Sequence, residues 1–434
     1  MGGLKARDHP QARVQLPAPL AQALTGILKL ARQRRETVFL VGGTTRDLLL
    51  GRPPLDLDLM VDGDAVGLAT ALAASVPARL TSHRRFATAV VHLPGGWRID
   101  LAAPRRESYG SHGALPVVTP ATPEEDLARR DFTINAMAWQ WGIHGPGRLL
   151  DPAGGQDDLQ ARSIRILHPA SFQDDPTRAY RAVRLACRLR FSLERHTARA
   201  LRRSVQQGGP RLLTPARRGR EVRLLAMEKD WPRTVLRAAR AGLLSDDHGG
   251  LVPPPPAACR RLQRGLASRP GRETLPVILA CMAMDGKSAE RGAGLGKLQI
   301  PGGMARRAEA ILDAARGLRQ RLKQLRHLPS PTQLAAWALD MDEDALLLAQ
   351  ACIPAGAQRL ALARFRRRRQ GISLHIDARD LLAAGGPRGP ELRRRLTATL
   401  RQRLAGHLRG RAAELAFALS PGALGSQRQR VGEV

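Results

Sequence analysis

The sequence of 434 residues is poor in cysteine, in aromatic residues and in long apolar runs. Its four cysteines are far apart and none belongs to a CxxC motif. This argues against a zinc site and a disulfide framework, and it is consistent with a reducing cytosol. No apolar run is long enough to span a bilayer, and the start "MGGLKARDHPQARVQLP" lacks the apolar core of a signal peptide. We therefore expect a cytoplasmic protein that does not bind membranes.

Negative charge is also scarce. Lys and Arg number 70 against 38 Asp and Glu, so the formal charge is +32. A GC-rich genome would explain arginine in place of lysine, but not the excess of positive over negative charge. Such an excess favours a polyanionic partner, and nucleic acid first among them. Because aromatic residues make up only 3% of the chain, stacking on bases would depend on arginine more than on Phe or Tyr.

The first 150 residues combine strand and helix patterns. Apolar residues at helical spacing predict a helix over 18–33, and a β-branched run predicts a strand over 37–43 that ends in two glycines. A short helix is expected over 44–51, with Thr44 or Thr45 as its N-cap. The remaining signals are an alternating strand over 54–61, a helix from about residue 63, and a hairpin over 87–103 that turns at Pro94-Gly95-Gly96. This is the pattern of a small α+β domain.

From about residue 160 the pattern is helical to the end, and no 34- or 40-residue repeat is evident. The connecting segments 206–210, 248–258 and 385–390 are rich in proline and glycine. We expect an α+β head with a mixed sheet, followed by an all-helical neck, body and tail. The expected boundaries are 1–150, 151–245, 246–350 and 351–434.

Asp56 and Asp58 alternate with leucines in the strand 54–61. Two residues apart on a strand, their carboxylates share a face at a separation of roughly 6–7 Å. Bare carboxylates that close raise one another's pKa unless a cation lies between them, and Mg²⁺ is the natural cation because it prefers oxygen ligands. Such a pair can hold metal ions that activate a hydroxyl and bind a triphosphate. Taken alone, the pair would also fit the solvated face of an amphipathic strand.

Gly42 and Gly43 stand between a strand and a helix, where glycines let backbone N–H groups approach an anion. The alternative is a tight strand–helix turn, for which one glycine would usually suffice. Arg46 and Asp47 follow on the helix. A strand, two glycines, a helix and a strand ending in DxD form a much more specific combination than any one of these features.

Two later segments carry further polar groups. In "RRDFTINA" (129–136) we expect a helix on which Asp131 and Asn135 share a face, suited to sugar hydroxyls, while an arginine holds a phosphate. In "QDDPTRAYRAVR" (173–184), Asp175 can accept a hydrogen bond from an exocyclic amino group and Arg178 can donate to ring nitrogens or carbonyls. Cytosine and adenine both present that pattern. Locally, each segment would also fit a helix with surface charges.

Together, "VGGTTRDLLLGRPPLDLDLMV" resembles the signature of the nucleotidyltransferase superfamily headed by DNA polymerase β. In detail it resembles the class II tRNA nucleotidyltransferases and bacterial poly(A) polymerases. Five further segments resemble motifs of that family in the family's order: 124–139, 149–167, 174–191, 214–227 and 375–396. The resemblance spans nearly the whole chain and is weakest around 250–350.

The resemblance implies a polymerase-β-like catalytic head at 1–150, a neck that reads the base, a helical body and a basic tail that binds tRNA. It implies a role for each of the following residues: Asp56 and Asp58 as catalytic Mg²⁺ ligands; Gly42, Gly43, Arg46 and Asp47 at the triphosphate; Arg129, Arg130, Asp131 and Asn135 at the ribose and phosphates; Asp174, Asp175 and Arg178 at the base; Arg181 and Arg184 in support; and Arg105, Glu107 and Tyr109 in a flexible loop. Asp100 is a candidate third metal ligand. Family members commonly carry Glu in place of Asp174.

The implied activity is addition of CMP and AMP from CTP and ATP to the 3′ acceptor end of tRNA, which builds or completes CCA. Enzymes that add only CC, only the terminal A, or poly(A) are alternatives, because the family divides these activities through subtle features of the loop and neck. A non-catalytic RNA-binding protein with a degenerate head is an alternative from another class. The arginine-rich run 363–371 is expected to contact RNA phosphates, and no obligate protein partner is expected.

Overall fold

The computed structural model describes residues 16–108, 117–244, 251–286, 293–296 and 298–423. Its contacts divide the chain into two compact units. The first contains the chain up to Glu221 together with Glu228–Asp230 and Ala241–Leu243, and the second contains the rest. The finer division into head, neck, body and tail stays a prediction. No helix in the described ranges is long and apolar enough to cross a bilayer.

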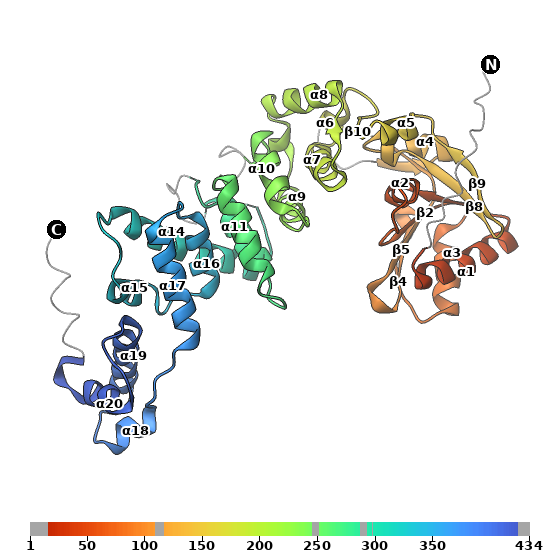
Figure 1. Cartoon of the computed structure of the whole chain (residues 1–434). Helices are drawn as coiled ribbons and strands as arrows, with labels where there is room; N and C mark the ends of the chain where they lie inside the picture. Colours follow the sequence, from red (N-terminus) through yellow and green to blue (C-terminus); the bar gives the residue numbers. More distant parts are fainter. Residues whose placement is uncertain (1–15, 109–116, 245–250, 287–292, 297, 424–434) are drawn as a thin grey trace. The chain divides into compact units, whose positions relative to one another are not determined.

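A seven-stranded mixed sheet forms the centre of the first unit (Figure 1), in the strand order β3-β4-β5-β2-β1-β8-β9. Only the β2–β5 pair is parallel. The strands of this sheet are β1 Thr37–Val41, β2 Leu57–Asp62, β3 Arg79–His83, β4 Thr88–His92, β5 Arg98–Ala102, β8 Ala138–Gly142 and β9 Gly145–Leu150. The expected hairpin is β4–β5, and its turn is Pro94–Gly96. Two small sheets pair β6 Arg105–Ser108 with β7 Val117–Pro120, and β10 Ser163–Ile164 with β11 Ser192–Leu193.

Helices surround this sheet and continue beyond it. They are α1 Ala18–Arg34, α2 Gly42–Leu49, α3 Ala65–Ser75, α4 Pro123–Ala128, α5 Gly155–Gln160, α6 Ser171–Asp174, α7 Thr177–Leu189 and α8 Arg195–Gln206, with α9 Pro215–Ala226 leading into the second unit. Local sequence explains where several of these helices begin. Asp64 caps α3 by accepting a hydrogen bond from the Gly67 N–H, and Thr122 with Glu125 forms a capping box at α4.

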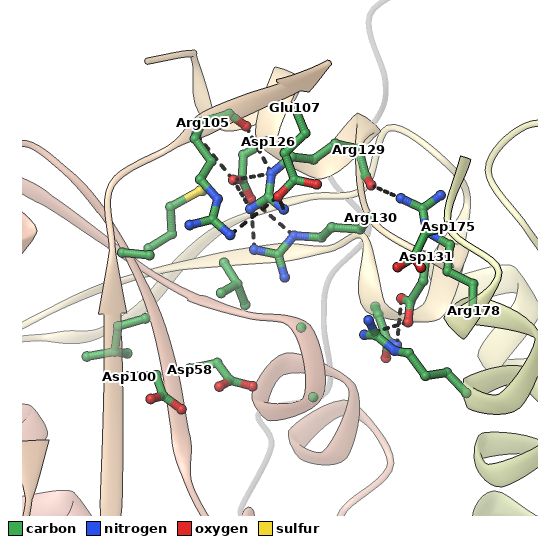
Figure 2. Close-up of a pocket in the computed structure, with 18 of the residues that line it drawn as sticks. Asp58, Asp100, Arg105, Glu107, Asp126, Arg129, Arg130, Asp131, Asp175 and Arg178 are labelled. Carbon is green, nitrogen blue, oxygen red and sulfur yellow. Dashed lines mark hydrogen bonds and ion pairs between the residues drawn. The ribbon is translucent and has the colours of Figure 1, made fainter. Parts of the chain in front are cut away.

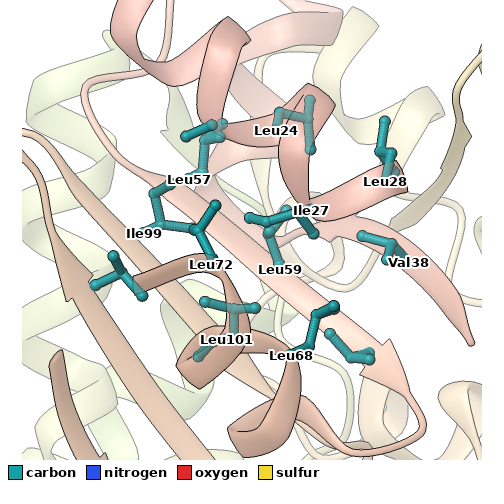
Figure 3. Close-up of a cluster of buried hydrophobic side chains, with 14 of the residues drawn as sticks. Leu24, Ile27, Leu28, Val38, Leu57, Leu59, Leu68, Leu72, Ile99 and Leu101 are labelled. Atoms are coloured by element: carbon teal, nitrogen blue, oxygen red, sulfur yellow. The ribbon is translucent and has the colours of Figure 1, made fainter. Parts of the chain in front are cut away.

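The main hydrophobic core lies between one face of the sheet and helices α1 and α3 (Figure 3). Leu57 and Leu59 of β2 point into it and are 0% and 2% exposed. Period-2 alternation turns Asp58 and Met60 to the opposite face of the sheet. The expected alternation is thus confirmed for Leu57 and Leu59. It is wrong for Leu55, which precedes the strand and is 80% exposed.

Every regular element among the described residues of the second unit is helical, as expected. They are α10 Trp231–Arg240, α11 Pro256–Ala267, α12 Leu275–Met282, α13 Ala293–Gly296, α14 Gly302–Gln324, α15 Pro331–Ala338, α16 Glu343–Cys352, α17 Ala357–Gly371, α18 Ala378–Ala383, α19 Pro390–Ala405 and α20 Arg411–Leu419. Three cysteines that are distant in sequence meet in this unit. All three thiols, those of Cys259, Cys281 and Cys352, are buried. The Cys259 thiol donates to the Pro254 carbonyl at 3.4 Å, and the neighbouring Cys281 thiol lowers the pKa of Cys259.

The arginine-rich run 363–371 forms the second half of α17, and its arginines have two different environments. Arg366 and Arg369 pair with Glu343, and Arg369 also donates to the carbonyl groups at the end of α15. Arg364 and Arg367 are exposed on the other side of the helix. Arg368 donates to the Arg403 carbonyl at 3.3 Å. Three of the five arginines therefore bind other parts of the second unit, which the charge run did not indicate.

Candidate active site

A cavity of about 490 Å³ lies on the face of the sheet opposite α1 and α3. In Figure 2, Asp58 and Asp100 lie together on one side of it, and Asp175 and Arg178 lie on the other. Its size is typical of a site for a small organic ligand.

The turn between β1 and α2 forms one wall of the cavity. Gly42 has φ of +60°, and a Cβ placed there would lie 3.0 Å from an Arg130 guanidinium nitrogen. A Cβ on Gly43 would lie 3.6 Å from Oδ2 of Asp58. Gly42 adopts a left-handed backbone conformation, and the Arg130 guanidinium lies close to its Cα. Both features explain why this position needs glycine.

Thr44 and Thr45 fix that turn against the sheet. The Thr45 hydroxyl donates to the Leu40 carbonyl at 2.6 Å. The Thr44 hydroxyl donates to the Asp56 carbonyl at 3.2 Å and accepts from the Asp58 N–H at 2.8 Å. The expectation that either threonine caps the helix is wrong, because α2 already begins at Gly42 and has no side-chain cap. Their hydroxyls instead hold the start of β2 beside the glycine turn.

Three carboxylates gather where β2 and β5 run in parallel. The strand register pairs Asp58 directly with Asp100. Burial, and next the neighbouring Asp100 carboxylate, raise the pKa of Asp58 to about 6. Asp56 precedes the strand, and its side chain is 42% exposed. Arg98 lies between the outer two carboxylates, 2.9 Å from Oδ2 of Asp100 and 3.6 Å from Oδ2 of Asp56. The site therefore attracts cations.

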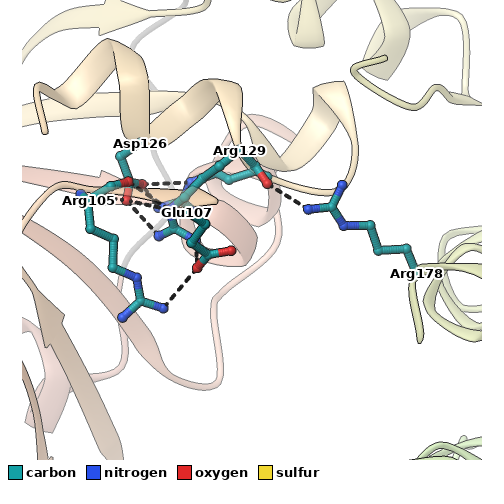
Figure 4. A network of polar contacts seen from close by, with 6 residues as sticks. Arg105, Glu107, Asp126, Arg129 and Arg178 are labelled. Atoms are coloured by element: carbon teal, nitrogen blue, oxygen red, sulfur yellow. Dashed lines mark hydrogen bonds and ion pairs between the residues drawn. The ribbon is translucent and has the colours of Figure 1, made fainter. Parts of the chain in front are cut away.

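Asp126 holds the two neighbouring arginines. Its Oδ1 accepts from Arg129 at 2.6 and 3.0 Å, and its Oδ2 accepts from Arg130 at 2.8 and 3.1 Å. Burial alone would raise the pKa of Asp126, but Arg130 and Arg129 outweigh it and lower the pKa. Arg129 also binds Glu107 at 2.7 Å and donates to the Arg105 carbonyl (Figure 4). The guanidinium of Arg129 thus binds residues of strand β6. The guanidinium of Arg130 instead lies near Asp58 and Gly42.

Asp131 lies almost fully buried at the base of the cavity. It accepts hydrogen bonds from the Phe132 N–H at 2.9 Å and from the Asn135 amide at 3.1 Å, and it pairs with Arg181 at 2.7 Å. Burial opposes its ionisation, but Arg181 and Asn135 outweigh burial and lower its pKa. The expected helix over 129–136 is wrong: Phe132 is extended, and only Thr133–Asn135 form a 3₁₀ turn. The buried Phe132 bridges to Ile166, which overrides the helical spacing.

Asp175 and Arg178 lie at the junction of α6 and α7. Oδ1 of Asp175 accepts from the Thr177 N–H at 3.1 Å and from Arg217 at 2.8 Å. Arg178 donates to the Ser171 hydroxyl and to the Arg129 carbonyl, both at 2.8 Å. Both side chains are therefore held in one orientation before any ligand arrives.

The comparisons with known proteins agree with this geometry. Residues 38–165 match the family model described as the poly A polymerase head domain. The multifunctional CCA protein of Halorhodospira halophila is 35% identical over 303 residues, which cover 66% of this chain and 69% of that protein. The chain belongs to the class II tRNA nucleotidyltransferase family.

Relatives within this family carry different activities in their names. The A-adding tRNA nucleotidyltransferase of Geobacter sulfurreducens is 40% identical over 55% of this chain, and the CC-adding enzyme of Deinococcus radiodurans is 46% identical over 35% of it and 40% of its own length. The chain spans only 27%, 23% and 49% of the lengths of three A-adding relatives. Among solved structures, the Thermotoga maritima CCA-adding enzyme complexed with tRNA has a TM-score of 0.76 at 25% identity, covering 95% of this chain and 98% of that chain. A CCA-adding enzyme complexed with CTP has the same score and identity and covers 99% of both chains.

Most residues expected at the nucleotide site of a tRNA nucleotidyltransferase line the cavity. They are Gly42, Gly43, Asp58, Asp100, Arg105, Glu107, Arg129, Arg130, Asp131, Asn135, Asp175, Arg178 and Arg181. Five others that the structure describes do not line it: Asp56, Arg46, Asp47, Asp174 and Arg184. Arg46 is buried against Asp47 and Asn135, and Asp56 lies at the strand start. Asp174 lies 3.8 Å from His168, and Arg184 pairs with Glu221 and Glu228. Tyr109 lies outside the described residues.

Two polar residues that line the cavity, Asp126 and Arg217, are not among the residues expected at the site. Asp126 precedes the two arginines that it binds by three and four positions, a spacing at which opposite charges meet on one helix. The segment "EEDLARR" (124–130) contains this i,i+3 and i,i+4 spacing of opposite charges. Arg217 lies in a recognised segment, but nothing in the sequence relates it to Asp175, 42 positions earlier.

Proposed function

We propose that the protein transfers CMP and AMP from CTP and ATP to the 3′ end of tRNA without a template and releases pyrophosphate. One observation carries this proposal: a single cavity combines a carboxylate cluster on the sheet, an open glycine turn with Arg130 beside it, and a rigid Asp175–Arg178 edge. These parts suit a metal ion, a triphosphate and a base respectively.

The carboxylates fit Mg²⁺. Burial, and next the Asp100 carboxylate, raise the pKa of Asp58, and the nearby Arg130 and Arg98 only partly offset them. Within the described residues no three acidic, His or Cys side chains converge on one point, but Mg²⁺ commonly takes only one or two protein carboxylates and completes its shell with phosphates and water. Asp56 and Asp58 would hold the ion, and Asp100 would join them. Bound Mg²⁺ lowers the pKa of an attacking hydroxyl and offsets charge on the phosphates.

The chain's own groups orient the nucleotide. The N–H groups at Gly42 and Gly43 and the Arg130 guanidinium would bind the triphosphate. Asp131 and Asn135 would bind the ribose hydroxyls, with Arg181 keeping Asp131 ionised. Asp175 would accept from the amino group of cytosine or adenine, and Arg178 would donate to the ring. Arg217 holds the Asp175 carboxylate, and Ser171 holds the Arg178 guanidinium. Because both side chains are fixed in this way, their hydrogen-bonding groups would select C and A without a template.

The test uses tRNA substrates that end before the first C, the second C or the A, each with CTP, ATP or both. Extension by both nucleotides to CCA supports the full activity, whereas incorporation of only CC or only A assigns a partial activity. Unlimited growth with ATP alone indicates poly(A) synthesis.

Asp58→Asn is the matched variant, because Asn preserves the shape of the side chain and removes its charge. We expect incorporation to fall by at least a hundredfold, with tRNA binding retained. If Asp58→Asn left incorporation unchanged, the metal assignment would be wrong. If the unaltered chain bound tRNA but incorporated nothing, the protein would be a non-catalytic RNA-binding member of the family.

A further inference from the structure

A second cavity of the first unit has no part in the proposed reaction. It has a volume of about 600 Å³ and is formed by residues 165–170, α6 and α8. We call it the neck groove. Its polar lining includes the following side chains: Arg165, His168, Glu194, His196, Arg199 and Arg203. Three of these six are arginines, whose positive charge favours an anionic ligand.

Only part of the groove's positive charge is paired with carboxylates of the chain. Its one carboxylate, Glu194, caps α8 by accepting from the Thr197 N–H at 2.9 Å. Arg165 is bound by both carboxylate oxygens of Asp158, at 2.9 to 3.1 Å. Arg199 and Arg203 are exposed, and the side chain of neither has a hydrogen bond or ion pair with a described residue. These two arginines are available for a ligand.

The shape of the groove suits a nucleic-acid strand better than a free triphosphate. Arg199 and Arg203 are four apart on α8, so their side chains leave the helix about 6 Å apart and follow its axis. They do not converge on one point, and no glycine turn lies among the lining residues to offer clustered N–H groups. Ile166, Leu167 and Phe172 also line the groove and make part of its wall apolar. Charges spaced along a partly apolar groove match successive phosphates with riboses between them.

The groove adjoins the candidate active site. Gln173 of α6 lines the groove, and Asp175, two residues later, lines the nucleotide cavity. The two lining residues are close neighbours along the chain, so a strand bound in the groove would lie near the junction of α6 and α7, where Asp175 is held. Asp174, which does not line the nucleotide cavity, faces His168 on the groove side.

We propose that the neck groove binds the sugar–phosphate backbone of the RNA primer, with Arg199 and Arg203 contacting its phosphates. The RNA identity of the ligand rests on the proposed function. The groove adds a contact that positions the primer independently of the incoming nucleotide.

The test compares two double variants of the full chain. Arg199→Gln/Arg203→Gln removes the two groove charges. Arg195→Gln/Arg202→Gln is the matched control, because it removes two exposed charges from the same helix at positions that do not line the groove. Equal thermal unfolding of both variants excludes a folding defect as the cause of any difference between them.

We expect the groove double variant to bind tRNA about tenfold more weakly at 150 mM salt, with a salt slope smaller by about 1.4 to 1.8 for two lost phosphate contacts. The control should lose less than about threefold. The KM values for CTP and ATP should not change in either variant.

Equal losses in the two double variants would overturn the proposal, because general surface charge would then explain the binding. A higher KM for CTP or ATP with unchanged tRNA affinity would also overturn it and indicate a small-anion site. Binding is measured separately from extension. A chain that binds tRNA through the groove but extends no substrate would therefore refute the proposed function and leave the groove supported.

Discussion

Arg98 provides a direct test of the carboxylate cluster. Its guanidinium lies 2.9 Å from Asp100 and 3.6 Å from Asp56, so it occupies the position of a cation between the outer carboxylates. A metal ion that binds these groups competes with Arg98. We therefore predict that Arg98→Gln binds divalent cations more tightly than the unaltered protein.

The magnitude follows from the exposure of the two ion pairs. The side chains of Arg98, Asp56 and Asp100 are 46%, 42% and 31% exposed, so water screens both pairs. Exposed ion pairs contribute roughly 0.2–1 kcal/mol each. Together they oppose a bound cation by about 1 kcal/mol, which corresponds to roughly fivefold in affinity.

Mn²⁺ can replace Mg²⁺ in this assay, since free Mn²⁺ is measured by electron paramagnetic resonance without any turnover. Arg148→Gln is the control, because Arg148 is exposed on β9 and does not line the carboxylate site. It should leave the affinity within about twofold. Unchanged or weaker Mn²⁺ binding in Arg98→Gln would refute the reasoning that Arg98 and the metal share these carboxylates.

Three other perturbations test the packing and the nucleotide site. Leu59→Ala should lower the free energy of unfolding by about 2–5 kcal/mol in urea, because Leu59 is fully buried against α1 and α3; Leu55→Ala, at an exposed position, should change it by less than about 0.5 kcal/mol. Burial alone would raise the pKa of Glu343, but its arginine partners outweigh burial and lower it. The ionised Glu343 carboxylate therefore stabilises the fold at pH values above the ordinary Glu pKa. This stabilisation is lost as the pH falls through the lowered pKa of Glu343 in the folded protein. Glu343→Gln should cost about 1–3 kcal/mol at pH 7 and nothing at strongly acid pH. Arg130→Gln should raise the KM for CTP about tenfold or more, whereas Arg129→Gln should act mainly on stability; equal KM effects would contradict the separate environments of the two arginines.

Much of the candidate site was predictable from local sequence. The alternation of Asp58 with leucines, the two glycines before α2 and the Asp175–Arg178 pair each express a short-range rule of side-chain direction or backbone freedom. The ion pairs of Asp126 with Arg129 and Arg130 follow the same kind of rule, because residues three and four apart on a helix are neighbours.

Local rules failed where a distant partner decided the outcome. The helical spacing of Asp131 and Asn135 gave way to an extended Phe132, because the backbone bridge to Ile166 and the burial of the Phe132 side chain outweigh a helical turn. Thr44 and Thr45 bind strand backbone, not the helix start, since α2 begins two residues before Thr44.

The sequence by itself determined the class of fold, the family and the chemical groups available, because periodicity, glycine placement and motif order are properties of neighbouring residues. Only the tertiary structure decided which groups meet. The parallel register of β2 and β5 sets Asp100 beside Asp58. Packing within the second unit brings Cys281 near Cys259, which lies 22 positions earlier. Packing also pairs Arg366 and Arg369 of α17 with Glu343 and leaves Arg364 and Arg367 exposed. Such contacts depend on pairing over long sequence separations, which the pattern along one segment does not encode.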